Sequence, residues 1–128
     1  MDERELKDRT KQFALRTMKL VDALPNSVSG RAIANQLVRA GTPVGANYRS
    51  ACRGRSKAEF CSKLETVVEE VDECCFWLEL IMESSLLPRK LVEPLFLEVN
   101  ELTAIFISSV RTAKSSIANQ KSKMIADL

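Results

Sequence analysis

The sequence predicts an all-α protein, an antiparallel up-down-up-down four-helix bundle, and three observations carry this prediction. First, apolar residues recur at steps of three and four in four separate segments, which is the period of an amphipathic helix. Second, the links between these segments are short, and short links make neighbouring helices antiparallel. Third, no segment alternates apolar and polar residues as a half-buried strand does. A chain of 128 residues, 45% of them apolar, suffices for one such domain.

The first helix is predicted over residues 6–24, where apolar or threonine side chains recur on one face. Pro25 ends it near Leu24, because proline disfavours helical geometry in the residue before it.

The second helix is predicted over residues 33–51. It contains Gly41 and Pro43. Because proline lacks an amide and its ring clashes with the preceding turn, we expect a kink or a brief interruption at Gly41 to Pro43.

The third helix has the clearest pattern, and we place it from Lys57 to Glu83. Its apolar residues follow a heptad with a second row beside it, which is the stripe width of a helix in a bundle core. Ser56 and Glu59 form a capping box at its start. The heptad places three cysteines on the buried face: Cys61, Cys74 and Cys75.

The fourth helix is predicted over residues 99–117, with apolar residues from Leu91 onward extending it toward the amino end. Pro88 and Pro94 both suit the first turn of a helix, so this segment is expected to begin as a separate turn.

The apolar pattern is lost after Asn119. We therefore expect one bundle domain, residues 1–119, followed by a frayed tail, residues 120–128.

The composition excludes several kinds of active site. The chain has no histidine, which is the commonest general base and metal ligand. Its four cysteines lack the spacing of a zinc site, and we interpret them as reduced core residues, with a redox switch as the alternative. No apolar run approaches the ~20 residues that span a bilayer, and the first residues are not signal-like. We expect a cytoplasmic protein without a metal or cofactor.

Charge is divided unevenly along the chain. The net charge of +2 combines +7 over residues 1–57, from twelve basic and five acidic side chains, with −5 over the remainder. No acid lies between Asp22 and Glu59, whereas residues 59–83 contain eight acids and one lysine. The first two predicted helices are therefore basic and the third is acidic.

The basic residues at the end of the second helix suggest a phosphate-binding surface that would bind nucleic acid without reading its sequence. The alternative is that the basic helices face the acidic one, within the bundle or across a subunit boundary. Tyr48 falls on the apolar stripe, and we expect it in the core. The candidate nucleic-acid-binding residues are Arg49, Arg53, Arg55 and Lys57, joined by Arg16 and Arg39.

Large apolar side chains also occur away from the predicted core stripes. Clustered groups of this kind mark partner surfaces, so we expect self-association, the alternative being cover by a neighbouring helix of the same subunit. The candidate interface residues are Phe76, Trp77, Leu97 and Ile107.

A third pattern consists of carboxylates at helical spacing. Carboxylates spaced by three or four on facing helices can hold Mg²⁺, as in the all-α nucleoside-triphosphate pyrophosphohydrolases that this pattern resembles. The heptad argues against this interpretation, because it puts Glu69 and Glu73 on the solvent side. The residues concerned are Glu69, Glu70, Glu73, Glu98 and Glu101.

The segment from Gln36 to Leu80 resembles the bacterial four-helix bundle proteins, some of which are encoded inside intervening sequences of 23S ribosomal RNA genes. The likeness runs over nearly the whole chain. Many members carry Asn-Ile-Ala-Glu-Gly where this chain has Asn47-Tyr48-Arg49-Ser50-Ala51. The most specific motifs are Gly45 to Arg49 and Arg53 to Phe60.

This resemblance implies an antiparallel bundle that assembles into a ring, typically a homopentamer, with no established enzymatic activity. A related bundle is the accessory protein of diversity-generating retroelements. It forms a basic pentameric barrel that binds nucleic acid and a reverse transcriptase, which favours nucleic-acid binding here.

Three hypotheses for function remain. The first is a non-enzymatic homo-oligomeric bundle that binds RNA or a ribonucleoprotein partner through its basic residues. The second is a protein-interaction scaffold with no nucleic-acid role. The third is the Mg²⁺-dependent nucleoside-triphosphate pyrophosphohydrolase.

Overall fold

The computed structural model describes residues 1–128 as five α-helices with no β-strand, which confirms the all-α prediction. The second predicted helix is divided in two, and the break lies at Thr42, inside the predicted interruption. The helices are α1 (Glu3–Asp22), α2 (Val28–Gly41), α3 (Pro43–Cys52), α4 (Lys57–Glu83) and α5 (Arg89–Ala126).

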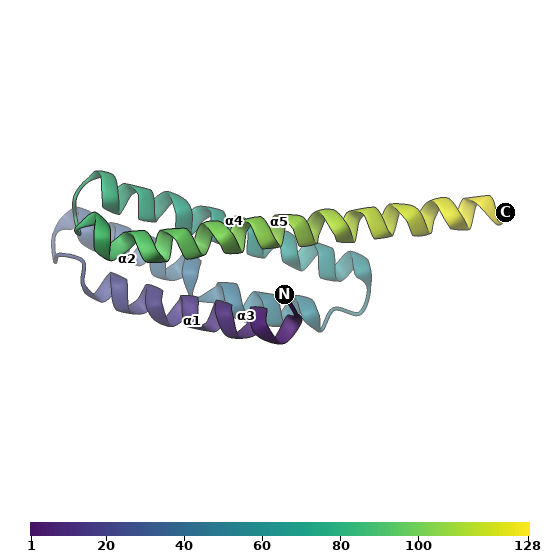
Figure 1. Ribbon diagram of the computed structural model, residues 1–128, viewed down its shortest axis with the longest axis horizontal. Coiled ribbons are helices and arrows are strands. Elements are labelled where there is room, and N and C mark those ends of the chain that lie inside the picture. The colour runs from purple at the N-terminus through teal and green to yellow at the C-terminus, as the bar shows by residue number, and fades with distance from the viewer.

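The helix α4 lies at the centre of the bundle. It packs along α5 and also contacts α2 and α3, while α1 packs mainly against α2 and α3. The α1–α2 and α4–α5 connections lie at one end of the bundle, and the α3–α4 connection lies at the other (Figure 1). The C-terminal part of α5 extends past the other helices (Figure 1). None of the helices combines the length and the apolar character needed to cross a membrane.

The apolar stripes of all five helices meet in one core. Cys61, Cys74 and Cys75 are buried as predicted, and all four cysteines are free. Burial raises the pKa of the Cys74 thiol, so this side chain stays protonated and packs as a small apolar group. Tyr48 is also buried, with its ring centroid 5.4 Å from that of Phe106, which confirms its predicted place in the core.

The start of α4 forms much as the sequence predicts. The Ser56 hydroxyl accepts a hydrogen bond from the Glu59 amide at 3.1 Å. The Glu59 carboxylate reaches back to the amide of Arg55, at 3.2 Å, one residue earlier than in the usual capping box. The side chain of Glu59 therefore holds the α3–α4 turn as well as the helix end.

Two glycines let α1 approach α2 and α3 closely. A Cβ atom added at Gly41 would lie 2.9 Å from Cγ2 of Thr17, and one added at Gly45 would lie 3.2 Å from Oγ1 of Thr10. Both threonines are fully buried. Their hydroxyls donate to backbone carbonyls one turn earlier in α1, at 2.9 Å for Thr10 and 2.8 Å for Thr17, so neither buried hydroxyl lacks a partner. The backbones meet where the side chains are smallest.

The start of α5 differs from the prediction. Pro94 was expected to begin a turn, but α5 is one continuous helix from Arg89, and Pro94 lies inside it. Proline has no amide, so the bond that residue 94 would donate to Lys90 is lost. Val92 and Leu95 are buried on either side of the proline, and their packing holds the helix through it.

The end of α5 also differs from the prediction. The frayed tail expected over residues 120–128 is helical as far as Ala126. Every residue from Ala118 onward is exposed, so this part of the helix has no partner in the subunit. Apolar periodicity reports burial, and it fails to report a helix that projects into solvent.

We predict that Gly41→Ala destabilises the fold. The added methyl would overpack the contact with Thr17, which typically costs about 1–3 kcal/mol, and Gly41 is the last residue of α2, so little helix propensity is gained in return. Urea denaturation measures the change. Adding Thr17→Ala removes the two atoms closest to the new methyl group, so the double variant should regain most of the lost free energy of unfolding. If the single and double variants are equally stable, the contact with Thr17 is not the cause of the destabilisation.

Candidate nucleic-acid interface

A basic groove lies between α1 and α3. Its volume is about 370 Å³, and three cationic side chains line it: Lys11 from α1, and Arg49 and Arg53 from the end of α3. Gly45 forms part of its floor. The groove therefore exists where the absence of a side chain at Gly45 brings the backbone of α3 against α1.

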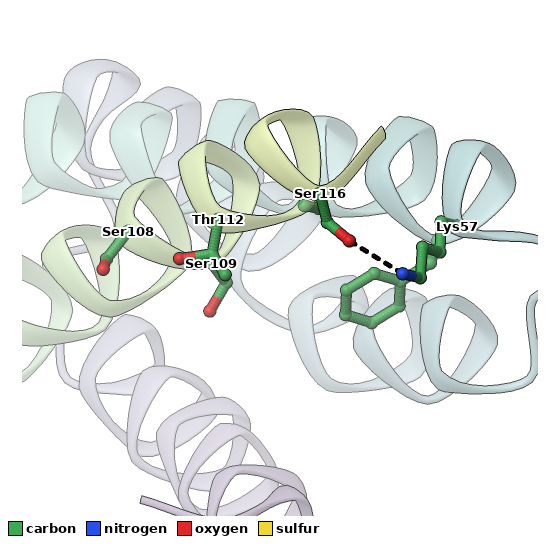
Figure 2. A pocket seen from close by; sticks show the side chains of 7 residues that line it. Lys57, Ser108, Ser109, Thr112 and Ser116 are labelled. Carbon is green, nitrogen blue, oxygen red and sulfur yellow. Dashed lines mark hydrogen bonds between the residues drawn. The ribbon is translucent and has the colours of Figure 1, made fainter. Parts of the chain in front are cut away.

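The six basic residues predicted to bind nucleic acid are all exposed, and none forms an ion pair with a carboxylate. Lys57 makes one side-chain contact, in which its ammonium group donates to Oγ of Ser116 at 2.7 Å (Figure 2). Unpaired exposed cations keep their full charge available to an anionic ligand. The alternative, in which these residues satisfy the acidic helix within one subunit, does not describe this structure.

The fold brings some of the predicted residues together and separates others. Arg49 and Arg53 share the groove, and Arg55 and Lys57 follow in the α3–α4 turn and at the start of α4. Arg16 instead lines a second groove, of about 300 Å³, between α1 and α5. Arg39, in α2, lines neither.

Lys11 is a groove residue that the sequence prediction missed. It lies next to Thr10, the residue that Gly45 contacts. Only the pairing of Gly45 with α1 could have indicated it, since Lys11 is distant in sequence from the other basic groove residues.

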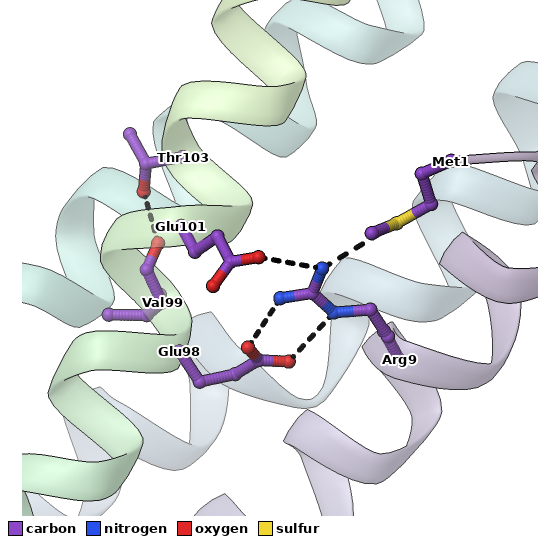
Figure 3. A network of polar contacts seen from close by, with 6 residues as sticks. All are labelled: Met1, Arg9, Glu98, Val99, Glu101 and Thr103. Carbon is purple, nitrogen blue, oxygen red and sulfur yellow. Dashed lines mark hydrogen bonds and ion pairs between the residues drawn. The ribbon is translucent and has the colours of Figure 1, made fainter.

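One arginine of α1 does pair with carboxylates. The Arg9 guanidinium bonds to both carboxylate oxygens of Glu98 and donates to Oε1 of Glu101 at 3.1 Å (Figure 3). This contact joins α1 to α5. Hydrogen bonding to Glu98 is the main cause of a raised pKa at Arg9. Two of the five carboxylates proposed for Mg²⁺ are therefore bound to an arginine.

The remaining carboxylates of the proposed magnesium site have other partners or none. Glu70 is half-buried and accepts two hydrogen bonds from the Asn47 amide, at 2.8 and 3.0 Å. Burial raises the pKa of Glu70, against the lowering effect of Asn47. Glu73 accepts from the Trp77 indole at 3.2 Å, and Glu69 is exposed. No three carboxylate or thiol groups converge closely enough to hold a metal ion.

Three of the four predicted interface residues are exposed. The exposed fraction is 52% for Phe76, 58% for Leu97 and 40% for Ile107. Trp77 is half-buried and packs against the core, and its ring meets that of Phe76 edge-on with centroids 5.0 Å apart. The neighbouring helices therefore cover Trp77 in part and leave the other three side chains open.

These observations define a class: a small all-helical bundle with an unpaired basic groove and exposed apolar side chains on its surface. The chain belongs to the 23S rRNA-intervening sequence protein family, whose model matches residues 3–108, as the motif resemblance predicted. It is similar to a crystal structure of a protein of unknown function from the S23 ribosomal protein family of Bacteroides thetaiotaomicron VPI-5482. The two are 31% identical with a TM-score of 0.76, over 82% of this chain and 97% of that chain. No curated protein matches the chain.

We predict that Arg9→Met lowers the free energy of unfolding by about 1–3 kcal/mol, because it leaves the largely buried Glu98 without its cation. Chemical denaturation measures this loss. In a double-mutant cycle, Arg9→Met with Glu98→Met should cost less than the sum of the single changes. Additive costs would show that the pair is not coupled.

We predict that Glu70→Gln changes how stability depends on pH. The folded pKa of Glu70 is raised, so its contribution to stability is present at low pH and is lost as the pH rises through the folded pKa. The glutamine variant lacks this loss and should gain stability relative to the wild type between about pH 4 and about pH 7. Urea denaturation at both pH values measures the difference, and Glu73→Gln on the same helix controls for the lost charge.

Proposed function

We propose that this protein is a non-enzymatic, homo-oligomeric helical bundle of the cytoplasm that binds RNA, alone or within a ribonucleoprotein partner. The binding surface consists of the α1–α3 groove with Lys11, Arg49 and Arg53, together with Arg55 and Lys57 beyond it. The contacts are to phosphates and carry no base specificity.

The observation that carries this proposal is the lack of carboxylate partners for the groove cations, in a chain whose acids nearly equal its bases. The chain has 17 acidic side chains, yet its five ion pairs leave Lys11, Arg49 and Arg53 free. Cations gathered in one groove repel one another, so a groove that keeps them unpaired suits an anionic ligand.

Assembly belongs to the same proposal. We take the bundle to be antiparallel, up-down-up-down, and to form a ring, with a pentamer as the favoured number of subunits. Exposed Phe76, Leu97 and Ile107 supply apolar surface for contacts between subunits. A ring repeats the basic groove around one axis, which multiplies the number of phosphates contacted and hence the salt dependence of binding.

The test compares wild type with Arg49→Ala/Arg53→Ala for binding to single-stranded RNA over a salt series, after light scattering has fixed the subunit number. Loss of two phosphate contacts per subunit should weaken binding on the order of tenfold at low salt and flatten the salt slope by about 1.4. Fluorescence anisotropy with a labelled oligonucleotide measures both.

The matched control is Arg31→Ala/Lys90→Ala, which removes the same charge from exposed positions at the opposite end of the bundle. It should leave most of the affinity intact. Equal losses in the two variants would mean that net charge, not the groove, governs binding. If the wild type does not bind RNA at low salt, the scaffold without a nucleic-acid role is the better description.

A further inference from the structure

The last part of α5 is an unpartnered amphipathic helix. α4 begins at Lys57, whose side chain bonds to Ser116, so α5 runs past the end of its neighbour from about this point (Figures 1 and 2). We define residues 117–126 as the arm. Within it, Ile117 and Met124 continue the seven-residue spacing of Val110, a half-buried residue that packs against the core beside the buried face of α5.

Ile117 is half-buried, and the apolar side chains of the arm beyond it face solvent in the single subunit. Met124 is 71% exposed and Ile125 is 69% exposed. A lone helix of this length is marginal in water without tertiary packing. The whole arm also lies beyond residue 108, where the family match ends, so the arm is an addition to the matched part of the bundle.

A groove of opposite charge lies on the outer side of α4 and α5. Its volume is about 340 Å³, and it is lined by apolar Val68, Ile107 and Val110, by the exposed carboxylates of Glu65 and Glu69, and by Lys114. Lys114 lies 3.8 Å from the Glu65 carboxylate, so Glu69 is the carboxylate of this groove that has no ion pair. The arm carries Lys121 and Lys123 and no acid. The two carboxylates and one lysine of the groove give it a net charge of −1, and the two lysines of the arm give it +2. Arm and groove are therefore opposite in net charge, and both contain apolar side chains.

We propose that the arm of one subunit binds the α4–α5 groove of a second copy of this chain. The arm cannot reach its own groove, because Ile107 and the arm lie on the same continuous helix. Pairing of two arms is disfavoured, since Lys121 lies between Ile117 and Met124 on the apolar face and would meet its counterpart.

The proposed contact joins two different surfaces, so each subunit donates one arm and accepts another. Contacts of this heterologous kind close into a ring or continue as a filament. The proposal rests on the self-association proposed above and assigns it an element, the arm, and an acceptor that includes Ile107, one of the predicted interface residues.

The experiment measures mass by light scattering for the wild type and for two variants. Met124→Asp/Ile125→Asp disables the arm, and Glu65→Lys/Glu69→Lys disables the groove. Each variant alone should lose the wild-type assembly, with at least a tenfold rise in the dissociation constant. Mixed together they should form a two-subunit species, because the intact arm of one fits the intact groove of the other.

Two further variants guard the interpretation. Glu79→Lys/Glu83→Lys makes the same charge change on α4 outside the groove and should assemble like the wild type. Lys121→Glu/Lys123→Glu added to the groove variant should restore assembly by reversing both charges. If circular dichroism shows that Met124→Asp/Ile125→Asp has lost helix, Lys121→Glu/Lys123→Glu in an otherwise wild-type chain takes its place as the arm variant.

The possible failures are distinguishable. If arm and groove variants keep the wild-type mass, the arm proposal is overturned while self-association stands. If the wild type has the mass of one subunit, 14.3 kDa, at every concentration, both are overturned. Loss of assembly in the control variant as well would overturn the groove as the acceptor.

Discussion

The close approach of α1 to α2 and α3 is the constraint on which the rest of the structure depends. Gly41 and Gly45 allow it, and the buried hydroxyls of Thr17 and Thr10 tolerate it because each bonds within its own helix. Helix axes can lie closest where one side contributes no side chain. The same contact brings Lys11 of α1 beside the arginines of α3, so helix packing and the basic groove have one origin.

The charge of the molecular surface depends on which carboxylates form ion pairs or hydrogen bonds within the subunit. Arg9 takes Glu98 and Glu101 into a partly buried contact between α1 and α5. Glu70 is bound to Asn47, and Glu59 is held by Lys63 and the Arg55 amide. These carboxylates pair with other groups and none pairs with a groove cation, so a chain of net charge +2 still presents an unneutralised cationic surface.

Most of the fold was predictable from the sequence, because the buried face of a helix requires apolar residues at steps of three and four. The heptad of α4 gave its bounds and its buried cysteines, and Pro43 gave the break after α2. Pro94 was misread because its neighbours Val92 and Leu95 hold the helix by packing, which local rules do not include. The site was predictable only in part: the basic residues could be listed, but their grouping with Lys11 and the separation of Arg16 depend on how the helices pair.

The arm is helical although its apolar pattern did not predict a helix. Its residues lack the dense apolar pattern of a core helix, yet they keep the register of α5 through Ile117 and Met124. A helix that ends at Ser116 would already satisfy the bundle, because α4 offers no surface beyond Lys57. The helical residues from Ala118 onward are all exposed, so their apolar side chains bury nothing in the isolated subunit. They are consistent with a surface completed by another chain, and the α4–α5 groove, with its apolar lining and its unpaired Glu69, is a surface on this molecule that complements them.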